Sequence, residues 1–298
     1  MFLRLVHLTR YDYSEPVSFA PHGLYLRPRQ TPRQRVHHYS LEISPTARRI
    51  ATHDPLDNAV DWAFFAPEEP ATRLEFRSEL LVETLESNPF DFYLKPSALT
   101  FPFTYDSTEQ ASLRTCLALR ADSPAPEFLR DWLDQRMPAP PTETVPYLMA
   151  LNTAVQRALV YTRRDEQGVQ STAQTLARGT GSCRDYAVLL MELCRALGLA
   201  ARFVSGYLYE PAACGTTPTL PPAMHAWAEV YLPGAGWRGL DPTRGVFCDD
   251  AFVTVAYAPF AENVNSIQGT SYGPATVTTT LTSVLSVEKL EPHNGVHA

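Results

Sequence analysis

The 298-residue sequence has no apolar run that approaches the roughly 18 residues needed to cross a membrane. Near the N-terminus, Arg4 and His7 interrupt the apolar residues, so this segment does not resemble a membrane span. We therefore expect a cytoplasmic protein that has no membrane partner.

The sequence also has no excess of positive charge. It contains 25 Lys and Arg residues against 32 Asp and Glu residues, which gives a formal net charge of −7. A broad surface for polyanions is not expected, so nucleic acid is a poor candidate partner. The sequence does not indicate the oligomeric state.

Paired cysteines are missing as well. The five cysteines, at positions 116, 183, 194, 214 and 248, are odd in number and show neither Cys-x-x-Cys pairing nor a His-rich ligand spacing. A disulfide framework and a structural zinc site are both disfavoured. The adjacent His37 and His38 point to opposite faces of a strand, so they cannot easily share a metal. We expect neither metal nor cofactor.

The first hundred residues carry the period-two and β-branched patterns of strands. These patterns lie at 2–13, 35–44, 59–66 and 72–84, separated by segments rich in Pro, Asp and Asn. A chain of this length is expected to divide into about two domains. We predict a β-sandwich-type N-terminal domain over residues 1–105.

Helical patterns follow an extended connector at 88–102. Apolar residues recur at helical spacing over 126–136 and 145–160, which predicts a helical connector at 106–150 that leads into a catalytic core at 151–260. The pattern then returns to strands, with a loop at 211–222 that carries Cys214. Residues 261–298 are predicted to be closing strands and a frayed end at 293–298.

The chain is organised around residues 178–199. Ser182 can cap a helix and Asp185 follows three residues later, so the helix should begin at Cys183. The free N–H groups and the positive end of the helix dipole there favour a nucleophilic thiolate. The alternative is a small core residue at a glycine-rich turn. Cys194 lies among leucines of the same helix and should be core.

A hairpin is predicted from strands at 225–231 and 237–241. His225 opens it and Asp241 ends it, and each lies eight residues from Pro233. A hairpin centred on Pro233 places the two side chains opposite each other, and one centred on Gly234 places them diagonally on the same face. Both registers need an odd-numbered loop, because an even loop would send the side chains to opposite faces.

Four motifs carry a resemblance to a known family. They are Gly-Ser-Cys-Arg-Asp-Tyr-Ala at 181–187, Ala-Arg-Phe-Val-Ser-Gly-Tyr-Leu at 201–208, Met-His-Ala-Trp-Ala-Glu-Val-Tyr at 224–231 and Gly-Trp-Arg-Gly-Leu-Asp-Pro-Thr at 236–243. They resemble the core of the bacterial transglutaminase-like superfamily, whose members are often described as cysteine proteases. The resemblance implies a papain-like α+β core, in which a helix bearing the cysteine packs on an antiparallel sheet bearing histidine and aspartate. The N-terminal segment resembles the β-domain that precedes this core in many members.

The resemblance also implies a role for each residue of a triad. Cys183 takes the position of the nucleophile, His225 that of the general base and Asp241 that of the orienting acid. The expected function is hydrolysis of peptide or isopeptide amide bonds through a thioester. After Thr243 the sequence departs from its relatives, with Arg244 in place of the usual Asn, which puts the choice of substrate in doubt.

Other residues are candidates for roles near this triad. An oxyanion needs two donors, each typically worth roughly 3 kcal/mol of the barrier. The N–H of Cys183 is one, and Gln170 or Tyr161 is a candidate for the other. Trp227 either shelters the imidazole or is a core aromatic. Arg184 and Asp185 are interpreted first as helix-start electrostatics and second as substrate contacts.

Two other classes of function stay open. Acyl transfer to an amine would use the same triad, because the outcome depends on how well water is kept from the thioester. A non-catalytic binding module is a distant alternative, because this fold also serves as a scaffold in proteins that have lost the cysteine. The intact Cys183, His225 and Asp241 argue against it.

Overall fold

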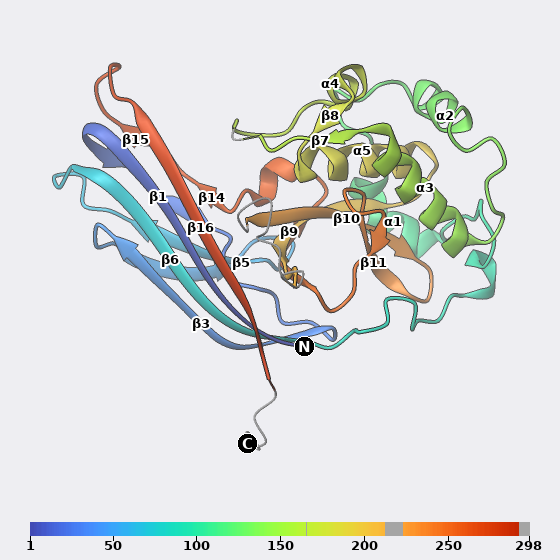
Figure 1. Cartoon of the computed structure of the whole chain (residues 1–298), viewed down its shortest axis with the longest axis horizontal. Helices are drawn as coiled ribbons and strands as arrows, with labels where there is room; N and C mark the ends of the chain where they lie inside the picture. The colour runs from blue at the N-terminus through green and yellow to red at the C-terminus, as the bar shows by residue number, and fades with distance from the viewer. Residues whose placement is uncertain (165, 212–222, 292–298) are drawn as a thin grey trace.

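The computed structural model describes residues 1–164, 166–211 and 223–291. A β-rich domain and a core of helices on a sheet lie side by side (Figure 1). The predicted α+β class with a β-rich N-terminal part is confirmed. Most of the expected loop at 211–222, with Cys214, and the expected frayed end at 293–298 lie outside the described residues.

The β-rich domain contains two antiparallel sheets. One has the order β15-β1-β6-β3 with β16 added to β1, and the other has the order β14-β2-β5-β4. Alternate side chains of β6, such as Leu74 and Phe76, are buried in the cluster that also contains Phe19 and Leu24. The strands are β1 (Phe2–Phe19), β2 (His22–Leu24), β3 (Gln34–Ser44), β4 (Arg48–His53), β5 (Ala59–Phe64), β6 (Ala71–Thr84), β14 (Ile267–Gln268), β15 (Ser271–Tyr272) and β16 (Thr279–Leu290).

The last strand closes the first domain. β16 pairs antiparallel with β1 from Phe2 opposite Leu290 to Tyr13 opposite Thr279, and Figure 1 shows the two running together along the domain. β14 and β15 also pair with the N-terminal strands β2 and β1. The chain therefore leaves the β-rich domain after β6, builds the core, and returns.

The core is a five-stranded sheet covered by helices. Its strand order is β12-β11-β10-β9-β13, and a separate parallel pair joins β7 to β8. The strands are β7 (Val160–Tyr161), β8 (Thr180–Gly181), β9 (Ala201–Leu208), β10 (Met224–Leu232), β11 (Gly236–Asp241), β12 (Val246–Phe247) and β13 (Phe252–Ala258). The helices are α1 (Ser107–Leu117), α2 (Pro126–Asp134), α3 (Thr144–Ala158), α4 (Thr172–Arg178) and α5 (Cys183–Ala196), with the short 3₁₀ helices η1 (Pro96–Ala98) and η2 (Ala261–Val264).

Helix α5 lies in the middle of the core. It contacts α2, α3, α4, β9 and β10, and nearly all of its side chains are buried. Cys194 is fully buried, and burial raises its pKa to about 12, which confirms the prediction that it is a core residue. The helix also buries the ion pair between Glu192 and Arg195, whose charged atoms are 2.9 Å apart. Such a pair is tolerated because each partner neutralises the other.

Two amide side chains of the β-rich domain join it to the core at the free edge of β13. Gln34 donates to the carbonyl of Thr254 at 2.7 Å and accepts from its N–H at 2.9 Å. Asn58 makes the same pair of bonds with Tyr257, at 2.8 and 3.0 Å. The edge strand of the core sheet thus pairs with side chains instead of with another strand.

Several elements, β4 and α1 among them, were not located individually by the sequence patterns. Every residue of β4 is exposed, so the strand carries no alternation of buried and exposed positions. In α1 only Leu113 and Cys116 are buried, which leaves too narrow an apolar face to reveal a helix. By contrast, α2 and α3 bury wider faces and lie within one or two residues of the predicted 126–136 and 145–160.

Candidate active site

The nucleophile candidate lies on the first turn of α5. Ser182 is the N-cap, and both its N–H and its hydroxyl donate to the carboxylate of Asp185, at 2.8 and 2.9 Å. The predicted helix start at Cys183 and the pairing of Ser182 with Asp185 are confirmed. Gly181 is required here, because a Cβ at this position would lie 2.8 Å from the Cβ of Asp185.

Asp185 is a buried anchor of this turn. It is fully buried, and its carboxylate accepts from Arg164 Nη1 at 2.8 Å on both oxygens and from the N–H of Gln170 at 2.7 Å. Burial alone would raise its pKa, but the hydrogen bonds from Arg164, Gln170 and Ser182 outweigh burial and lower it. Asp185 therefore stays ionised and holds the helix start, which agrees with the first of its two interpretations.

The side chain of Gln170 also bonds Asp185. Its Nε2 donates to Asp185 at 3.2 Å and to the carbonyl of Thr180 at 3.1 Å, and its oxygen accepts from Arg178 at 2.9 Å. Both amide protons are engaged, and the side chain is buried. As placed, Gln170 has no proton left for an oxyanion.

Arg184 holds the segment that follows β7. Its Nη2 donates to the carbonyls of Arg164 and Glu166, both at 3.1 Å. These contacts tie the helix start to the chain beside it. They favour the structural interpretation of Arg184 over a substrate contact.

The predicted hairpin has the register centred on Gly234. β10 pairs with β11 from Ala228 opposite Leu240 to Leu232 opposite Gly236, so the loop has three residues. Continuing this register by one residue places Asp241 opposite Trp227, two residues from His225 and therefore on the same face. His225 Nε2 lies 2.8 Å from Asp241 Oδ2.

Asp241 is fully buried and accepts hydrogen bonds on both oxygens. Oδ2 faces His225, and Oδ1 accepts from the N–H of Thr243 at 2.9 Å and from its hydroxyl at 2.7 Å. Burial would raise the pKa of Asp241, but the hydrogen bonds and the charge of His225, together with Thr243, lower it. The carboxylate is therefore ionised at neutral pH.

The pKa of His225 responds to both other residues of the expected triad. Burial alone would lower its pKa, but hydrogen bonds with Asp241 and Cys183 and the charges of these two groups raise the pKa of His225 to about 10. Since Nε2 faces Asp241, Nδ1 is the ring nitrogen left for Cys183. Cys183 itself is 8% exposed, so the thiol lies just below the surface.

Two aromatic rings surround the imidazole. The ring centroids of Trp227 and Phe252 lie 6.3 and 6.2 Å from that of His225, and the two aromatic rings meet edge to face at 5.3 Å. Trp227 is 1% exposed. It therefore fits both of its interpretations, because it is a core aromatic that also covers the imidazole.

Tyr161 lies beside the nucleophile. It pairs with Gly181 across the parallel strands β7 and β8, and its side chain is 44% exposed. Burial and the negative charges of Cys183 and Asp241 raise the pKa of its phenol, while Arg163 and Arg184 act in the opposite direction. The phenol is therefore protonated and within the electrostatic field of the thiol.

Three residues that support this site were not among the predicted site residues: Arg164, Asn152 and Thr243. Thr243 had a local signal, because a threonine two residues after an aspartate can donate back to its carboxylate. Arg164 and Asn152 had none, since they come from other elements and meet the site only in the folded chain.

Three more cysteines lie in the described part of the chain. Burial raises the pKa of Cys116, Cys194 and Cys248. Within the described ranges, no group of three or more His, Cys, Asp or Glu side chains could hold a metal ion. None of the helices described is both long and apolar enough to span a membrane.

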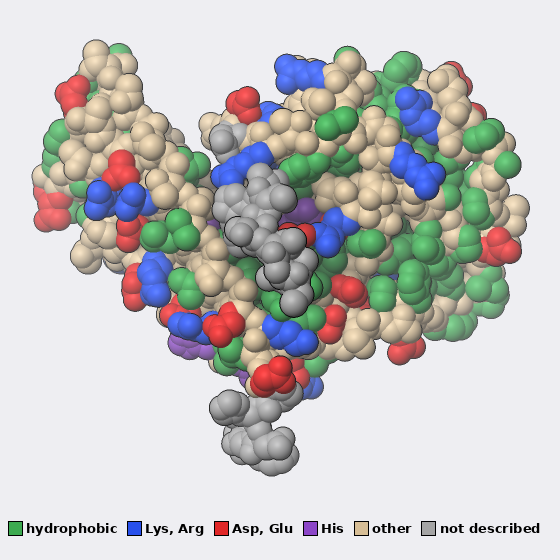
Figure 2. Space-filling model, viewed as in Figure 1, with side chains coloured by type: hydrophobic (Ala, Val, Ile, Leu, Met, Phe, Trp, Pro, Cys, Tyr) green, Lys and Arg blue, Asp and Glu red, His purple; other side chains and the backbone are tan. Residues whose placement is uncertain are grey.

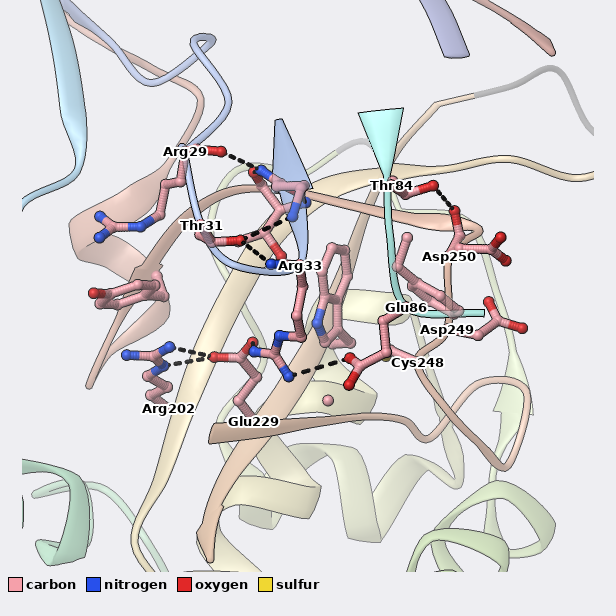
Figure 3. Close-up of a pocket in the computed structure, with 16 residues that line it drawn as sticks. Arg29, Thr31, Arg33, Thr84, Glu86, Arg202, Glu229, Cys248, Asp249 and Asp250 are labelled. Carbon is pink, nitrogen blue, oxygen red and sulfur yellow. Dashed lines mark hydrogen bonds and ion pairs between the residues drawn. The ribbon is translucent and has the colours of Figure 1, made fainter. Parts of the chain in front are cut away.

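A small cavity lies between the two domains, apart from Cys183 and His225. It has a volume of about 60 Å³ and is lined by charged residues of both domains, including Arg33, Arg202 and Glu229, as well as by Trp227 (Figure 3). Arg202 donates to Glu229 at 2.7 Å and lies over the ring of Tyr257 at 3.3 Å. That pair lies within the core sheet, and Arg33 of the β-rich domain pairs with Glu229 across the interface at 3.6 Å, so the cavity belongs to the contact between domains.

On the face seen in Figure 2, the molecule is hollowed between the β-rich domain and the core. Basic side chains, drawn in blue, lie on the core side of this hollow.

Comparison with known sequences matches both parts of the chain. Residues 3–83 match the bacterial transglutaminase-like N-terminal region, and residues 132–242 match the transglutaminase-like superfamily. The chain therefore contains a transglutaminase-like core, preceded by the N-terminal region that accompanies such cores in bacteria. The expected resemblance and the predicted transglutaminase-like core are thereby confirmed.

Three similar proteins come from bacteria. The uncharacterized protein Rv2569c of Mycobacterium tuberculosis is 28% identical over 90% of this chain and 87% of its own length. The uncharacterized protein ML0607 of Mycobacterium leprae is 26% identical over 90% and 92%. A crystal structure from Cytophaga hutchinsonii, provisionally described as a cysteine protease, shares the fold with a TM-score of 0.72 at 16% identity, over 100% of this chain and 94% of its own.

Proposed function

We propose that this protein is a thiol-dependent hydrolase of peptide or isopeptide amide bonds. Cys183 would be the nucleophile, His225 the acid and base, and Asp241 the group that orients His225. The observation that carries the proposal is one imidazole that bonds Asp241 at 2.8 Å and whose pKa is raised by both Asp241 and Cys183. The transglutaminase-like fold is consistent with this chemistry.

The first half-reaction forms a thioester. A protonated His225 beside the sulfur favours the thiolate, which attacks the carbonyl carbon of the amide. A carbon–sulfur bond forms and the carbonyl becomes an oxyanion. When the oxyanion collapses, the carbon–nitrogen bond breaks and His225 gives its proton to the leaving amine.

The second half-reaction releases the acid. Neutral His225 accepts a proton from water, whose oxygen attacks the thioester. Collapse of the second oxyanion breaks the carbon–sulfur bond, and the thiolate leaves beside the newly protonated His225. Throughout the cycle Asp241 keeps the imidazole oriented and stabilises its charged form.

Two donors are proposed for the oxyanion. The N–H of Cys183 is at the first helical position, where no intrahelical acceptor exists. The phenol of Tyr161 is the second, which its exposure and its electrostatic coupling to Cys183 support. Gln170 is the weaker candidate because its amide protons are already engaged.

The test is a search for an acyl adduct on the full chain. Wild type is incubated with a peptide panel that includes isopeptides, and intact mass reports any thioester. We expect an adduct on Cys183 and peptide products, whereas Cys183→Ala should give neither. Cys116→Ala is the matched control, since that thiol is buried in α1 and should leave the reaction unchanged.

Adding a primary amine to the same experiment separates hydrolysis from acyl transfer. Products that carry the amine would favour the transferase alternative, whereas free acid supports the hydrolase. If Cys183→Ala keeps full activity, the assignment of the nucleophile is wrong. A partner that binds wild type and Cys183→Ala equally, without any turnover, would favour the binding module.

A further inference from the structure

The two oxygens of the Asp241 carboxylate have separate partners. Oδ2 lies 2.8 Å from His225 Nε2, and in the described part of the chain Oδ1 accepts only from Thr243. The bond from the Thr243 hydroxyl is the shorter of the two to Oδ1, at 2.7 Å. A carboxylate held at both oxygens cannot rotate about its last bond without losing a hydrogen bond on one side.

The turn that carries Thr243 is itself fixed. The N–H of Gly245 donates to the carbonyl of Asp241 at 2.8 Å, and Gly245 has a positive φ of 71°. From α3, the fully buried Asn152 donates to the carbonyls of Asp241 and Val246 at 3.2 and 3.0 Å. The backbone therefore brings the hydroxyl of Thr243 to Oδ1 with little freedom beyond its own rotamer.

We infer that Thr243 is a positioning residue, whose hydroxyl holds the Asp241 carboxylate in the orientation that His225 needs. The inference rests on the proposed function for its catalytic consequence, but the geometry does not depend on any substrate. Thr243 acts through Asp241 and not on the reacting atoms.

The Thr243 hydroxyl also stabilises the negative charge of Asp241. A buried carboxylate is stabilised as an anion by each donor, and an ionised Asp241 is what stabilises protonated His225. Among the described residues, titratable groups that interact electrostatically with this pair include Cys183 from α5, Tyr161 from β7 and Cys248 from the segment after β12. Each of these three groups becomes negatively charged when it ionises. None of them, once ionised, can therefore stabilise the Asp241 carboxylate in place of the Thr243 hydroxyl.

The test compares Thr243→Val, which keeps the shape of the side chain and loses the donor, with Thr243→Ser, which restores the hydroxyl. Thr276→Val is the matched control, because the Thr276 hydroxyl donates to the Glu15 carboxylate at 3.2 Å on the exposed surface of the other domain. The first readout is the rate of iodoacetamide alkylation of Cys183 against pH, followed by intact mass. It needs no substrate.

In Thr243→Val we expect the acidic midpoint of Cys183 alkylation to rise by about 0.5–1 pH unit, because the weakened Asp241 stabilises the thiolate–imidazolium pair less. Thr243→Ser and Thr276→Val should stay within about 0.2 pH unit of wild type. With a substrate, kcat of Thr243→Val should fall about tenfold and KM should change less than about twofold.

A wild-type alkylation profile in Thr243→Val would overturn the inference, and so would a Thr243→Ser profile that matches Thr243→Val. If Thr243→Val does not fold, Thr243→Ala is measured in its place against the same two limits. Failure of the proposed function looks different, since wild type would then turn over no substrate while the alkylation profiles still report on Thr243.

Discussion

The β-rich domain and the core differ in whether their charged side chains are exposed or buried. In the β-rich domain most ion pairs lie on the outer faces of strands, as between Arg73 and Asp12 or between Arg4 and Glu79. In the core, Asp185, Glu192 and Asp241 are fully buried, each with a cationic partner. Burial of these carboxylates in the core carries a desolvation cost, which the exposed ion pairs of the β-rich domain largely avoid.

This difference follows the position of the candidate site. Two of the buried carboxylates, Asp185 and Asp241, hold the elements that carry Cys183 and His225, and each accepts several hydrogen bonds. A buried carboxylate has few alternative partners, so it fixes one arrangement of its donors. Exposed pairs can exchange with water and fix little.

The largest expected effect is on the nucleophile of the core. Cys183→Ala should lower turnover by at least about 1,000-fold, because no other group can form the thioester. Adding His225→Ala should cost almost nothing further, since the proton-transfer partner then has no nucleophile to serve. Rates of the two variants and of wild type, measured on one substrate, decide this. Additive losses would show that the residues do not act as a unit.

Removing the partner of a buried charge is the most direct test of this difference between the domains. Arg195→Met should lower the free energy of unfolding by about 3–5 kcal/mol, because Glu192 is left buried without its cation. In the β-rich domain, Arg73→Met should leave the urea midpoint unchanged, since its pair with Asp12 is exposed. Equal shifts of the two midpoints would contradict the comparison.

The proposed oxyanion donor gives a smaller effect, confined to activity. Tyr161→Phe should raise the barrier by roughly 3 kcal/mol, which is about 100-fold in kcat, while the urea midpoint stays near that of wild type. Tyr272→Phe, at an exposed position of β15, is the matched control. A kcat equal to that of wild type would show that Tyr161 is not the second oxyanion donor.

The last effect is on pH dependence and concerns the histidine where the domains meet. His7 of β1 bonds Tyr207 of β9 at 3.1 Å, and burial lowers its pKa to about 4. In the unfolded chain its pKa is about 6.5, so below that pH the unfolded state binds more protons and stability falls. We expect a loss of up to roughly 3 kcal/mol between pH 6.5 and pH 4.

His7→Gln removes this titration and keeps a neutral donor and acceptor. Its unfolding free energy should depend less on pH over that window than that of wild type, as measured by urea titrations at several pH values. His225 has the opposite sign: its pKa is raised to about 10, so its contribution is complete below about pH 6.5 and is lost as the pH rises toward 10. Parallel pH curves for wild type and His7→Gln would exclude His7 as the source.

Local patterns in the sequence predicted much of this molecule. The start of α5 at Cys183 follows from Ser182 and Asp185, which are three residues apart and bond each other. The hairpin was restricted to two registers by the positions of His225 and Asp241. The alternation in β6 and the leucines around Cys194 predicted which side chains are buried. In each case the interacting residues are close in the chain, so spacing alone carries the information.

Tertiary structure determined the features that depend on contacts between segments distant in the sequence. The register centred on Gly234 is packed against the connector, where the N–H of Lys95 donates to the carbonyl of Pro233 at 2.9 Å. The amide of Gln170 was directed to Asp185 by the fold of the segment between them. The closing strand β16 finds β1 from the other end of the chain. Such contacts depend on which surfaces meet once the core has formed, and no local spacing records that.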